Sequence, residues 1–313
     1  MSEEVRNPKD WSRELGSIER LCAVRNMTST RLFQLLDRDL PMGHFAGGKN
    51  LPNQTAAKEF NWRRYANGAP IYRLVPVNGR YMVIPAHLNN ELIVPLVADA
   101  IDADTDAVVE LGCGYGRLLF ALRDILEHQW PKLRYFGGEL SGSGLAAARR
   151  VAALEPERAA ITFHKFDYLN PDLSFVAGCR KVVFFTCHSI EQVQEIQDIL
   201  ILRMCDIAPQ VQCIHAEPVG WQLNAQAIGK TAKGAFDHSL RLRPSNDVDD
   251  FFSALVSTKS QWNRNLLPVL QKVALGGKII LEPPEINACG NDTYNPTTLV
   301  YWSKPASADQ ISN

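Results

Sequence analysis

Hydrophobic and polar positions follow a regular rhythm from about residue 85 onward, where short apolar runs take turns with longer stretches of helical periodicity. The apolar runs predict strands at 107–111, 133–139, 160–165, 181–186, 210–216, 278–281 and 298–302. The periodic stretches predict helices at 86–101, 117–127, 142–154, 190–204 and 262–274. Strands that are apolar throughout, as the run VVFF is, are typical of a parallel sheet covered on both faces. We therefore predict an α/β fold with a doubly wound, mostly parallel sheet of seven strands.

Two parts of the chain depart from this rhythm. Residues 1–84 combine amphipathic segments at 11–25 and 29–39 with breaker-rich stretches such as PMGHFAGGKNLPN. We expect them to form a mainly helical N-terminal cap that covers the substrate, ahead of a main domain at 85–313. After the fifth predicted strand, about 45 residues precede the next helix, which is too many for an ordinary connection. This segment, at about 219–261, predicts an internal lid insertion.

Composition and charge narrow the range of partners. The chain has 313 residues, of which 46% are hydrophobic and 21% are charged, so it can bury a large core. Its net charge of −1 provides no positive field that would concentrate nucleic acid or anionic lipid. The stretch FNWRRYANGAPIYR at 60–73 interleaves aromatic and arginine residues, which in a neutral chain favours packing within the cap over an RNA surface. We expect a small-molecule substrate and neither nucleic acid nor a membrane as partner, while a homodimer is left open.

The cysteines and the N-terminal segment indicate the cellular compartment in which the protein is expected. The seven cysteines are scattered without a CxxC pair, which is typical of a reduced protein rather than of a disulfide framework or a zinc site. The segment MSEEVRNPKDWSRE is polar where a secretory signal would be apolar, and no apolar stretch approaches the roughly 18 residues of a membrane span. We expect a cytoplasmic protein.

The most distinctive motif is VVELGCGYGRLLFAL at 108–122, where glycines stand at every second position between a strand and a helix. A glycine-rich turn after a strand of a parallel sheet lets the backbone approach a ligand closely. A dinucleotide fingerprint needs a glycine where Arg117 stands, so the spacing disfavours NAD. The candidate cofactor-binding residues of this turn are Glu110, Gly112, Cys113, Gly114, Tyr115 and Gly116.

Acidic residues end the next two predicted strands. Glu139 is followed by Leu140, and Asp167 is followed by Tyr168. Together with the turn, these acids resemble the motifs of the class I S-adenosylmethionine-dependent methyltransferases, whose motif I reads E-x-G-x-G-x-G. The resemblance covers about residues 85–304, and the segment NPTTLVYWSK looks like the final antiparallel strand of that family.

The resemblance implies that the cofactor is S-adenosyl-L-methionine. It implies that the turn cradles the methionine moiety and that the leading acid, here Glu110, helps to hold its ammonium group. The acid after the second strand, here Glu139, would accept both ribose hydroxyls, and Asp167 would bind the adenine amino group. Phe166 or Tyr168 could stack on the base. The positive charge of this cofactor agrees with acids placed around the turn.

Four ionisable residues are candidates for catalysis at the ends of the fourth and fifth predicted strands. Glu191 follows His188 by three residues, and His215 and Glu217 point to one side of their strand. His188 would be a general base or a substrate ligand, or else a brace for the turn. His215 would join the site or be a satisfied core histidine, and Glu217 would contact substrate or end its strand. A divalent-metal site is a further alternative, but the spacing matches no ligand motif and we assign no metal.

These observations predict a methyltransferase that acts on a nitrogen or oxygen of a small polar metabolite by in-line displacement. The acidic residues near the acceptor favour nitrogen slightly. A protein or RNA methyltransferase is the alternative among enzymes. The alternative from another class is a non-catalytic regulatory or partner subunit that binds S-adenosylmethionine.

Overall fold

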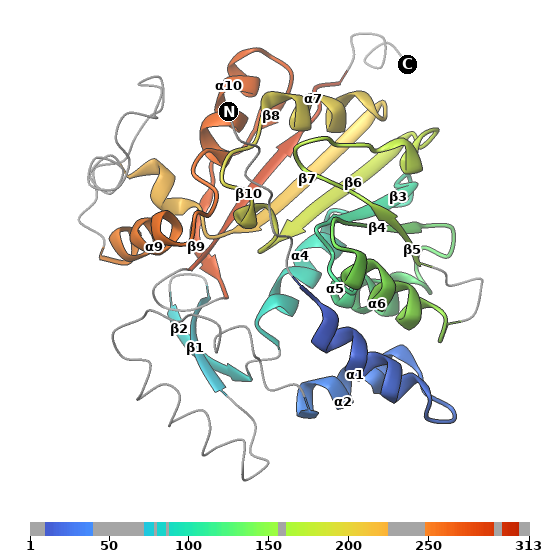
Figure 1. The fold of residues 1–313 in the computed structure, drawn as a ribbon. Coiled ribbons are helices and arrows are strands. Elements are labelled where there is room, and N and C mark those ends of the chain that lie inside the picture. The colour runs from blue at the N-terminus through green and yellow to red at the C-terminus, as the bar shows by residue number, and fades with distance from the viewer. Residues whose placement is uncertain are drawn as a thin grey trace, which may run out of the picture.

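The computed structural model describes residues 10–39, 72–77, 80–85, 88–155, 161–224, 248–290 and 296–306. Within these ranges, ten strands form one mixed sheet with helices on both faces (Figure 1). The strands are β1 (Tyr72–Val77), β2 (Arg80–Pro85), β3 (Ala107–Leu111), β4 (Arg134–Glu139), β5 (Ile161–Lys165), β6 (Lys181–Cys187), β7 (Gln210–Glu217), β8 (Ile280–Leu281), β9 (Glu285–Cys289) and β10 (Thr297–Ser303). Their order across the sheet is β2-β1-β9-β10-β7-β6-β3-β4-β5, and β8 pairs with the end of β10.

The middle of the sheet is parallel and doubly wound. Strands β5, β4, β3, β6 and β7 are neighbours that run in the same direction. The chain builds outward from β3 to β5 and then returns to the other side of β3, so the strand order reverses between β3 and β6. Strand β10 lies antiparallel beside β7, as the resemblance implied for the last strand. The predicted α/β fold class and mostly parallel central sheet are confirmed, and the reversal marks where such sheets bind ligands.

The sheet is larger than the seven predicted strands because the prediction missed β1, β2 and β9. Strands β1 and β2 form a hairpin that joins β9 through the pair Val77 and Cys289. This hairpin extends the central sheet although it lies in the stretch expected to be a mainly helical cap. The strand predicted at 278–281 shrinks to the two residues of β8. Pro283 and Pro284, which have no amide hydrogen, separate β8 from β9.

Helices cover the sheet on both sides. One face carries α1 (Ser12–Cys22), α2 (Ser29–Asp39), α4 (Val94–Asp99), α5 (Arg117–Leu126) and α6 (Gly142–Ala152). The other face carries α7 (Asp198–Asp206) and α10 (Leu266–Leu275), while α9 (Val248–Lys259) packs against η7 (Gly220–Leu223). Three further 3-10 turns are η3 (Asn90–Ile93), η5 (Ser174–Val176) and η6 (Ile190–Gln192).

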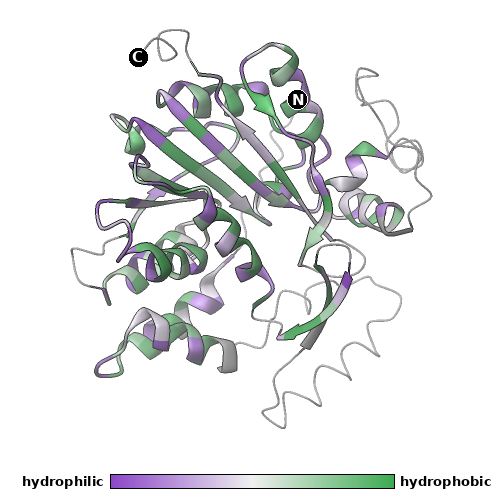
Figure 2. Cartoon of the chain, turned by 180° about the vertical axis from the view of Figure 1, so that it is seen from behind, coloured by the Kyte–Doolittle hydropathy of each residue, from purple (hydrophilic) through white to green (hydrophobic). Residues whose placement is uncertain are grey.

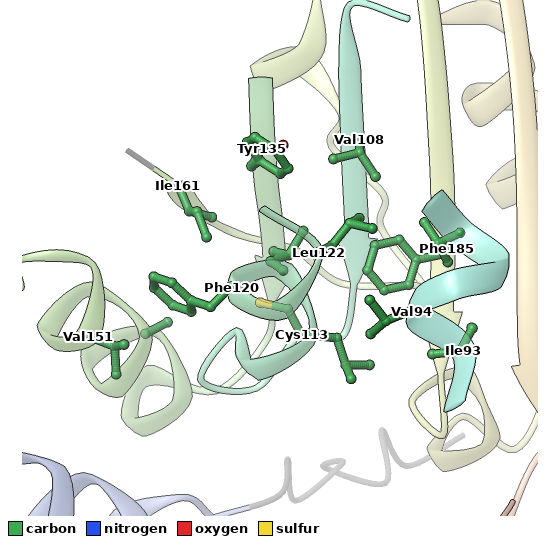
Figure 3. Close-up of a cluster of buried hydrophobic side chains, with 14 of the residues drawn as sticks. Ile93, Val94, Val108, Cys113, Phe120, Leu122, Tyr135, Val151, Ile161 and Phe185 are labelled. Carbon is green, nitrogen blue, oxygen red and sulfur yellow. The ribbon is translucent and has the colours of Figure 1, made fainter. Parts of the chain in front are cut away.

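Each central strand divides its side chains between two apolar clusters, one on each face of the sheet. On β3, Val108 belongs to the cluster beneath α5, whereas Val109 belongs to the cluster beneath α10. Figure 3 shows Phe120 and Leu122 of α5 in the first cluster together with side chains of β3, β4 and β6. The central strands are hydrophobic over much of their length (Figure 2), which accounts for their continuous apolar runs.

The helix predicted at 190–204 is broken in the structure. Only the short η6 and then α7 are helical, and the residues between them are not. Asn263 Nδ2 donates to the Val193 carbonyl at 2.8 Å, and the Ile196 amide donates to Asn265 Oδ1 at 2.9 Å. These tertiary hydrogen bonds replace the intrahelical ones. The same asparagines precede α10, which begins at Leu266 rather than at the predicted residue 262.

The lid predicted at about 219–261 is described only at its two ends. Asn224 Nδ2 donates to Asp250 Oδ2 at 2.9 Å, and both side chains are buried, so the two ends of the insertion lie side by side. Residues 225–247 lie outside the described residues, as do 40–71 of the predicted cap. No helix within the described ranges is long and apolar enough to cross a membrane.

Candidate functional site

The glycine turn (Gly112–Gly116) connects β3 to α5 at the reversal point of the sheet. Its three glycines have φ angles of 75°, 55° and 81°, which residues with side chains rarely adopt. The amides of Gly112 and Cys113 donate to the Gly138 carbonyl at 2.7 and 3.0 Å, which fixes the turn on the end of β4. The turn therefore lies at the carboxyl ends of β3 and β4, where a ligand is expected.

Gly112 brings the turn into direct contact with the segment after β6. A Cβ on Gly112 would lie 2.3 Å from the Ser189 Cβ. Ser189 Oγ and the Tyr168 hydroxyl both donate to the Leu111 carbonyl, at 2.8 and 2.6 Å. The ends of β3 and β6 are thus joined beneath the turn, and Ser189 is a site residue that the sequence did not indicate.

Glu110 lies inside the protein near the end of β3. Its side chain is 3% exposed, the Leu119 amide donates to its carboxylate, and Oε2 has no hydrogen-bond partner among the described residues. Burial, and then the charge of Glu139, raise the pKa of Glu110 well above its ordinary value. A positively charged ligand fits this arrangement, because it would pair with the open oxygen and stabilise the ionised carboxylate.

Glu139, at the end of β4, holds the glycine turn to the start of α6. Oε2 accepts the Gly114 amide at 2.9 Å and Oε1 accepts the Ser141 amide at 2.8 Å. Each carboxylate oxygen has a second lone pair, so the group keeps the capacity to accept two ribose hydroxyls. The next residue, Leu140, is half-buried.

The residues after β5 only partly match their expected roles. Asp167 is half-buried, and its Oδ1 accepts the Leu169 amide at 2.9 Å. Phe166 and Tyr168 are buried and pack edge to face with ring centroids 5.1 Å apart. The expected stacking of either ring on the base does not fit this burial, because both rings serve the interior. Asp167 keeps a partly exposed carboxylate and stays the candidate for the adenine.

The Cys113 thiol points into the apolar interior. It is 7% exposed, and its Sγ lies 3.7 Å from the Gly114 carbonyl. Burial, followed by the charges of Glu110 and Glu139, raises the pKa of the Cys113 thiol well above its ordinary value. A thiolate is therefore disfavoured, and the side chain of Cys113 serves the packing of the interior.

Tyr115 and Gly116 form the outer part of the turn and contact other protein groups. The Tyr115 ring lies against Trp11 and Phe33, with centroids 5.3 and 6.1 Å apart. A Cβ on Gly116 would lie 2.6 Å from the Phe163 ring. Tyr115 therefore packs against the N-terminal helices, and Gly116 lies against the core.

His188 follows β6 in a strained conformation, with a φ angle of 49°. Its Nδ1 lies 3.3 Å from Glu191 Oε2, its Nε2 lies 2.9 Å from Thr297 Oγ1, and its amide donates to the Ala216 carbonyl. Such strain clusters at functional sites. In the tautomer whose Nδ1 donates to Glu191, Nε2 is the basic nitrogen. The structure therefore brings His188 and Glu191 together, as their spacing predicted.

Glu217, at the end of β7, is fully buried and supports the turn that carries His188. Its carboxylate accepts the amides of Ser189 and Ile190 at 3.2 and 3.3 Å, and the Glu191 amide at 3.2 Å. Burial, and then the charge of Glu191, raise the pKa of Glu217 to about 7, against the lowering effect of His188. Glu217 is thus near the predicted base, but its oxygens hold backbone rather than facing solvent.

His215 has the geometry of the core histidine that the sequence left as an alternative. It is fully buried in β7, accepts from Trp302 Nε1 at 3.0 Å through Nε2, and lies 3.0 Å from Thr186 Oγ1 through Nδ1. Burial lowers the pKa of His215 to about 3, so the ring is neutral. Thr186 in turn hydrogen-bonds Glu217. His215 is therefore a structural support behind Glu217, and we remove it from the proposed catalytic set.

Thr186, Thr297 and Trp302 were not predicted, because their roles come from contacts between strands that are distant in sequence. β10 pairs antiparallel with β7 and so places Thr297 beside His188 and Trp302 beside His215. Within the described ranges, no group of three or more His, Cys, Asp or Glu side chains is arranged to hold a metal ion.

Comparison of the sequence with protein-family models and with curated proteins gives no match. Among solved structures, the methyltransferase domain of a bacterial Hen1 protein is 17% identical, covers 70% of this chain and 100% of its own, and has a TM-score of 0.42. Magnesium protoporphyrin IX methyltransferase from Synechocystis, with bound S-adenosylhomocysteine, is 12% identical over 70% and 85%, with a TM-score of 0.41. Geranyl diphosphate C-methyltransferase from Streptomyces coelicolor is 9% identical over 69% and 78%, with a TM-score of 0.45.

Proposed function

We propose that the protein binds S-adenosyl-L-methionine and transfers its methyl group to a nitrogen or oxygen of a small polar metabolite. The observation that carries the proposal is the pair of buried carboxylates behind the glycine turn. Glu110 has an oxygen without a partner among the described residues, and Glu139 lies close enough to raise the pKa of Glu110. Two adjacent buried acids are costly without a counterion, so they favour a cationic ligand.

The proposed division of roles follows the order of the strands. Glu110 would pair with the ammonium group of the cofactor, Glu139 with its ribose hydroxyls, and Asp167 with its adenine. When bound, S-adenosylmethionine supplies an electrophilic methyl group. His188 would accept the proton of the attacking nucleophile at Nε2, while Glu191 orients the ring through Nδ1.

A binding experiment tests the cofactor end without knowledge of the acceptor. Calorimetry should show that S-adenosylhomocysteine binds, whereas NADH does not. Glu110→Gln should weaken the binding of S-adenosylhomocysteine by about 2 kcal/mol, the range for removing a charged partner of a buried polar group. The same variant should bind 5′-methylthioadenosine as the wild type does, because that ligand has no ammonium group.

Glu139→Ala is the matched variant for the ribose. It should weaken both ligands by about 2 kcal/mol, since both carry the two hydroxyls. Unchanged affinities in this variant would remove Glu139 from the site. A Glu110→Gln variant that weakens both ligands equally would show that Glu110 acts through folding rather than through the ammonium group.

One observation favours the alternative of a non-catalytic subunit that binds the cofactor. The polar groups around His188 are largely used inside the protein, since Glu217 holds three amides and Nε2 of His188 meets Thr297. A labelled-methyl screen across pools of metabolites, tRNA and protein, with mass spectrometry of the product, separates the two functions. Transfer to any acceptor would exclude the non-catalytic alternative. Labelling confined to tRNA or protein would show that the acceptor is a macromolecule and not a small molecule.

A further inference from the structure

Trp11, the residue before α1, connects the N-terminal helices to the proposed cofactor site. Its amide donates to Ser143 Oγ on α6 at 3.0 Å, and its carbonyl accepts the Leu15 amide at 2.8 Å. Its indole meets the Tyr115 ring edge to face, with centroids 5.3 Å apart and an interplanar angle of 88°. Trp11 is therefore held by the glycine turn on one side and by α6 on the other.

Two glycines make room for this indole. A Cβ on Gly114 would lie 2.7 Å from Trp11 Cζ2, and a Cβ on Gly144 would lie 2.9 Å from Trp11 Cδ1. We call the space between these two residues the glycine slot. Glu139 borders the slot on both sides, because its carboxylate accepts the Gly114 amide and its Cγ lies 2.9 Å from the same ideal Cβ of Gly144. The indole thus lies beside the acid proposed to bind the ribose.

Helix α1 is packed too firmly to act as a loose flap over the slot. Ile18 is fully buried and belongs to the same apolar cluster as α5 and α6, and the neighbouring Ser17 is also buried. Removing the indole from the slot would expose this interface to water, at a cost set by the apolar area that is uncovered. The contacts therefore favour an indole that stays in place.

Building on the proposed function, we propose that Trp11 is a fixed wall of the cofactor site and contacts the bound cofactor beside Glu139. A flat aromatic surface suits this position, because it packs against the apolar edges of a nucleoside and attracts a nearby cation. This gives the N-terminal helices a direct part in cofactor binding. A Cβ on Gly114 or Gly144 would collide with this wall.

Affinity measurements on three variants test the wall. Trp11→Ala should raise the dissociation constant for S-adenosylhomocysteine about tenfold, and Trp11→Phe about threefold, in line with the usual strength of aromatic contacts to nucleosides and cations. Trp130→Ala is the matched control, because it removes a partly buried indole from the same apolar cluster beyond the far end of α5. This control should leave the dissociation constant unchanged.

Fluorescence gives a second measurement that a purely structural role would not affect. Addition of S-adenosylhomocysteine should change the tryptophan emission of the wild type, and this change should be absent in Trp11→Phe, which keeps an aromatic ring and preserves the fold. Trp11→Ala with wild-type affinity would overturn the proposal. Tighter binding would also overturn it, since the indole would then obstruct the slot. A wild type that binds no S-adenosylhomocysteine would defeat the proposed function itself, and the wall with it.

Discussion

The left-handed backbone of His188 decides which substitution can test its proposed role in catalysis without also disturbing the fold. An alanine there would lose the ring and keep the strain, whereas asparagine tolerates positive φ angles better than most residues. We therefore choose His188→Asn as the test of the proposed base. It should bind S-adenosylhomocysteine as the wild type does, because the residue lies after β6 rather than in the glycine turn.

With an acceptor in hand, kcat of His188→Asn should fall by about 10²- to 10⁴-fold, the usual contribution of a positioned base. Glu191→Gln is the companion variant, and it should lower kcat less because it removes only the partner of Nδ1. A His188→Asn enzyme with unchanged kcat and KM would leave His188 as a brace between Glu191 and Thr297, with catalysis resting on alignment alone.

At the scale of elements, the glycine turn supplies a test of how β3 and β6 are joined. A Cβ on Gly112 would collide with Ser189 and would also lie 3.1 Å from the Tyr168 hydroxyl, in a residue with a φ angle of 75°. Gly178 has a φ angle of 83°, but a Cβ there would meet nothing within 4 Å. The two glycines therefore separate the cost of backbone conformation from the cost of a clash.

Chemical denaturation of the two alanine variants measures both costs. Gly178→Ala should lower the free energy of unfolding by about 1 kcal/mol, the price of a left-handed conformation. Gly112→Ala should lower it by more than about 3 kcal/mol, because overpacking adds to that strain. Equal losses would mean that Ser189 can move away and that the contact beneath the turn is not tight.

Some helices and strands could be predicted from the sequence, and others could not. The seven predicted strands all recur because each depends on a local apolar run, as at 107–111 and 181–186. The break after Gln192 was not predictable, because it depends on hydrogen bonds with the side chains of Asn263 and Asn265, which lie some seventy residues away. The position of Trp11 in the glycine slot was not predictable either, because it depends on the packing of α1 against α6.

At the scale of the whole molecule, the predicted cofactor residues gather because parallel strands end at one edge of the sheet. Glu110, Glu139 and the glycine turn meet at the carboxyl ends of the neighbouring strands β3 and β4. The proposed acceptor end depends instead on β10, whose antiparallel pairing with β7 places Thr297 beside His188 and Trp302 beside His215. Sequence patterns therefore predicted that Glu110, Glu139 and the glycine turn lie together, but not the contacts that Thr297 and Trp302 make.

The buried ring of His215 makes the stability of the whole fold depend on pH. Burial lowers the pKa of His215 from 6.5 to about 3, so the folded protein keeps this ring neutral while the unfolded chain takes up a proton below pH 6.5. The stabilisation from His215 is thus complete above pH 6.5 and is lost as the pH falls toward 3. Between pH 7 and pH 5 the loss should be about 2 kcal/mol.

Replacing His215 with a side chain that does not titrate isolates this contribution. His215→Gln should be less stable than the wild type at pH 7, because its contacts to Thr186 and Trp302 are altered. The difference should shrink by about 2 kcal/mol at pH 5, since only the wild type loses stability through this ring. Glu217, whose pKa is raised to about 7, changes stability in the opposite sense, but it is present in both proteins and its effect cancels in the difference.

His128→Gln, which replaces a side chain that is 93% exposed, is the control and should differ from the wild type equally at both pH values. A His215→Gln difference that stays constant with pH would show that His215 is not held neutral in the core, and it would return this residue to the candidates for catalysis.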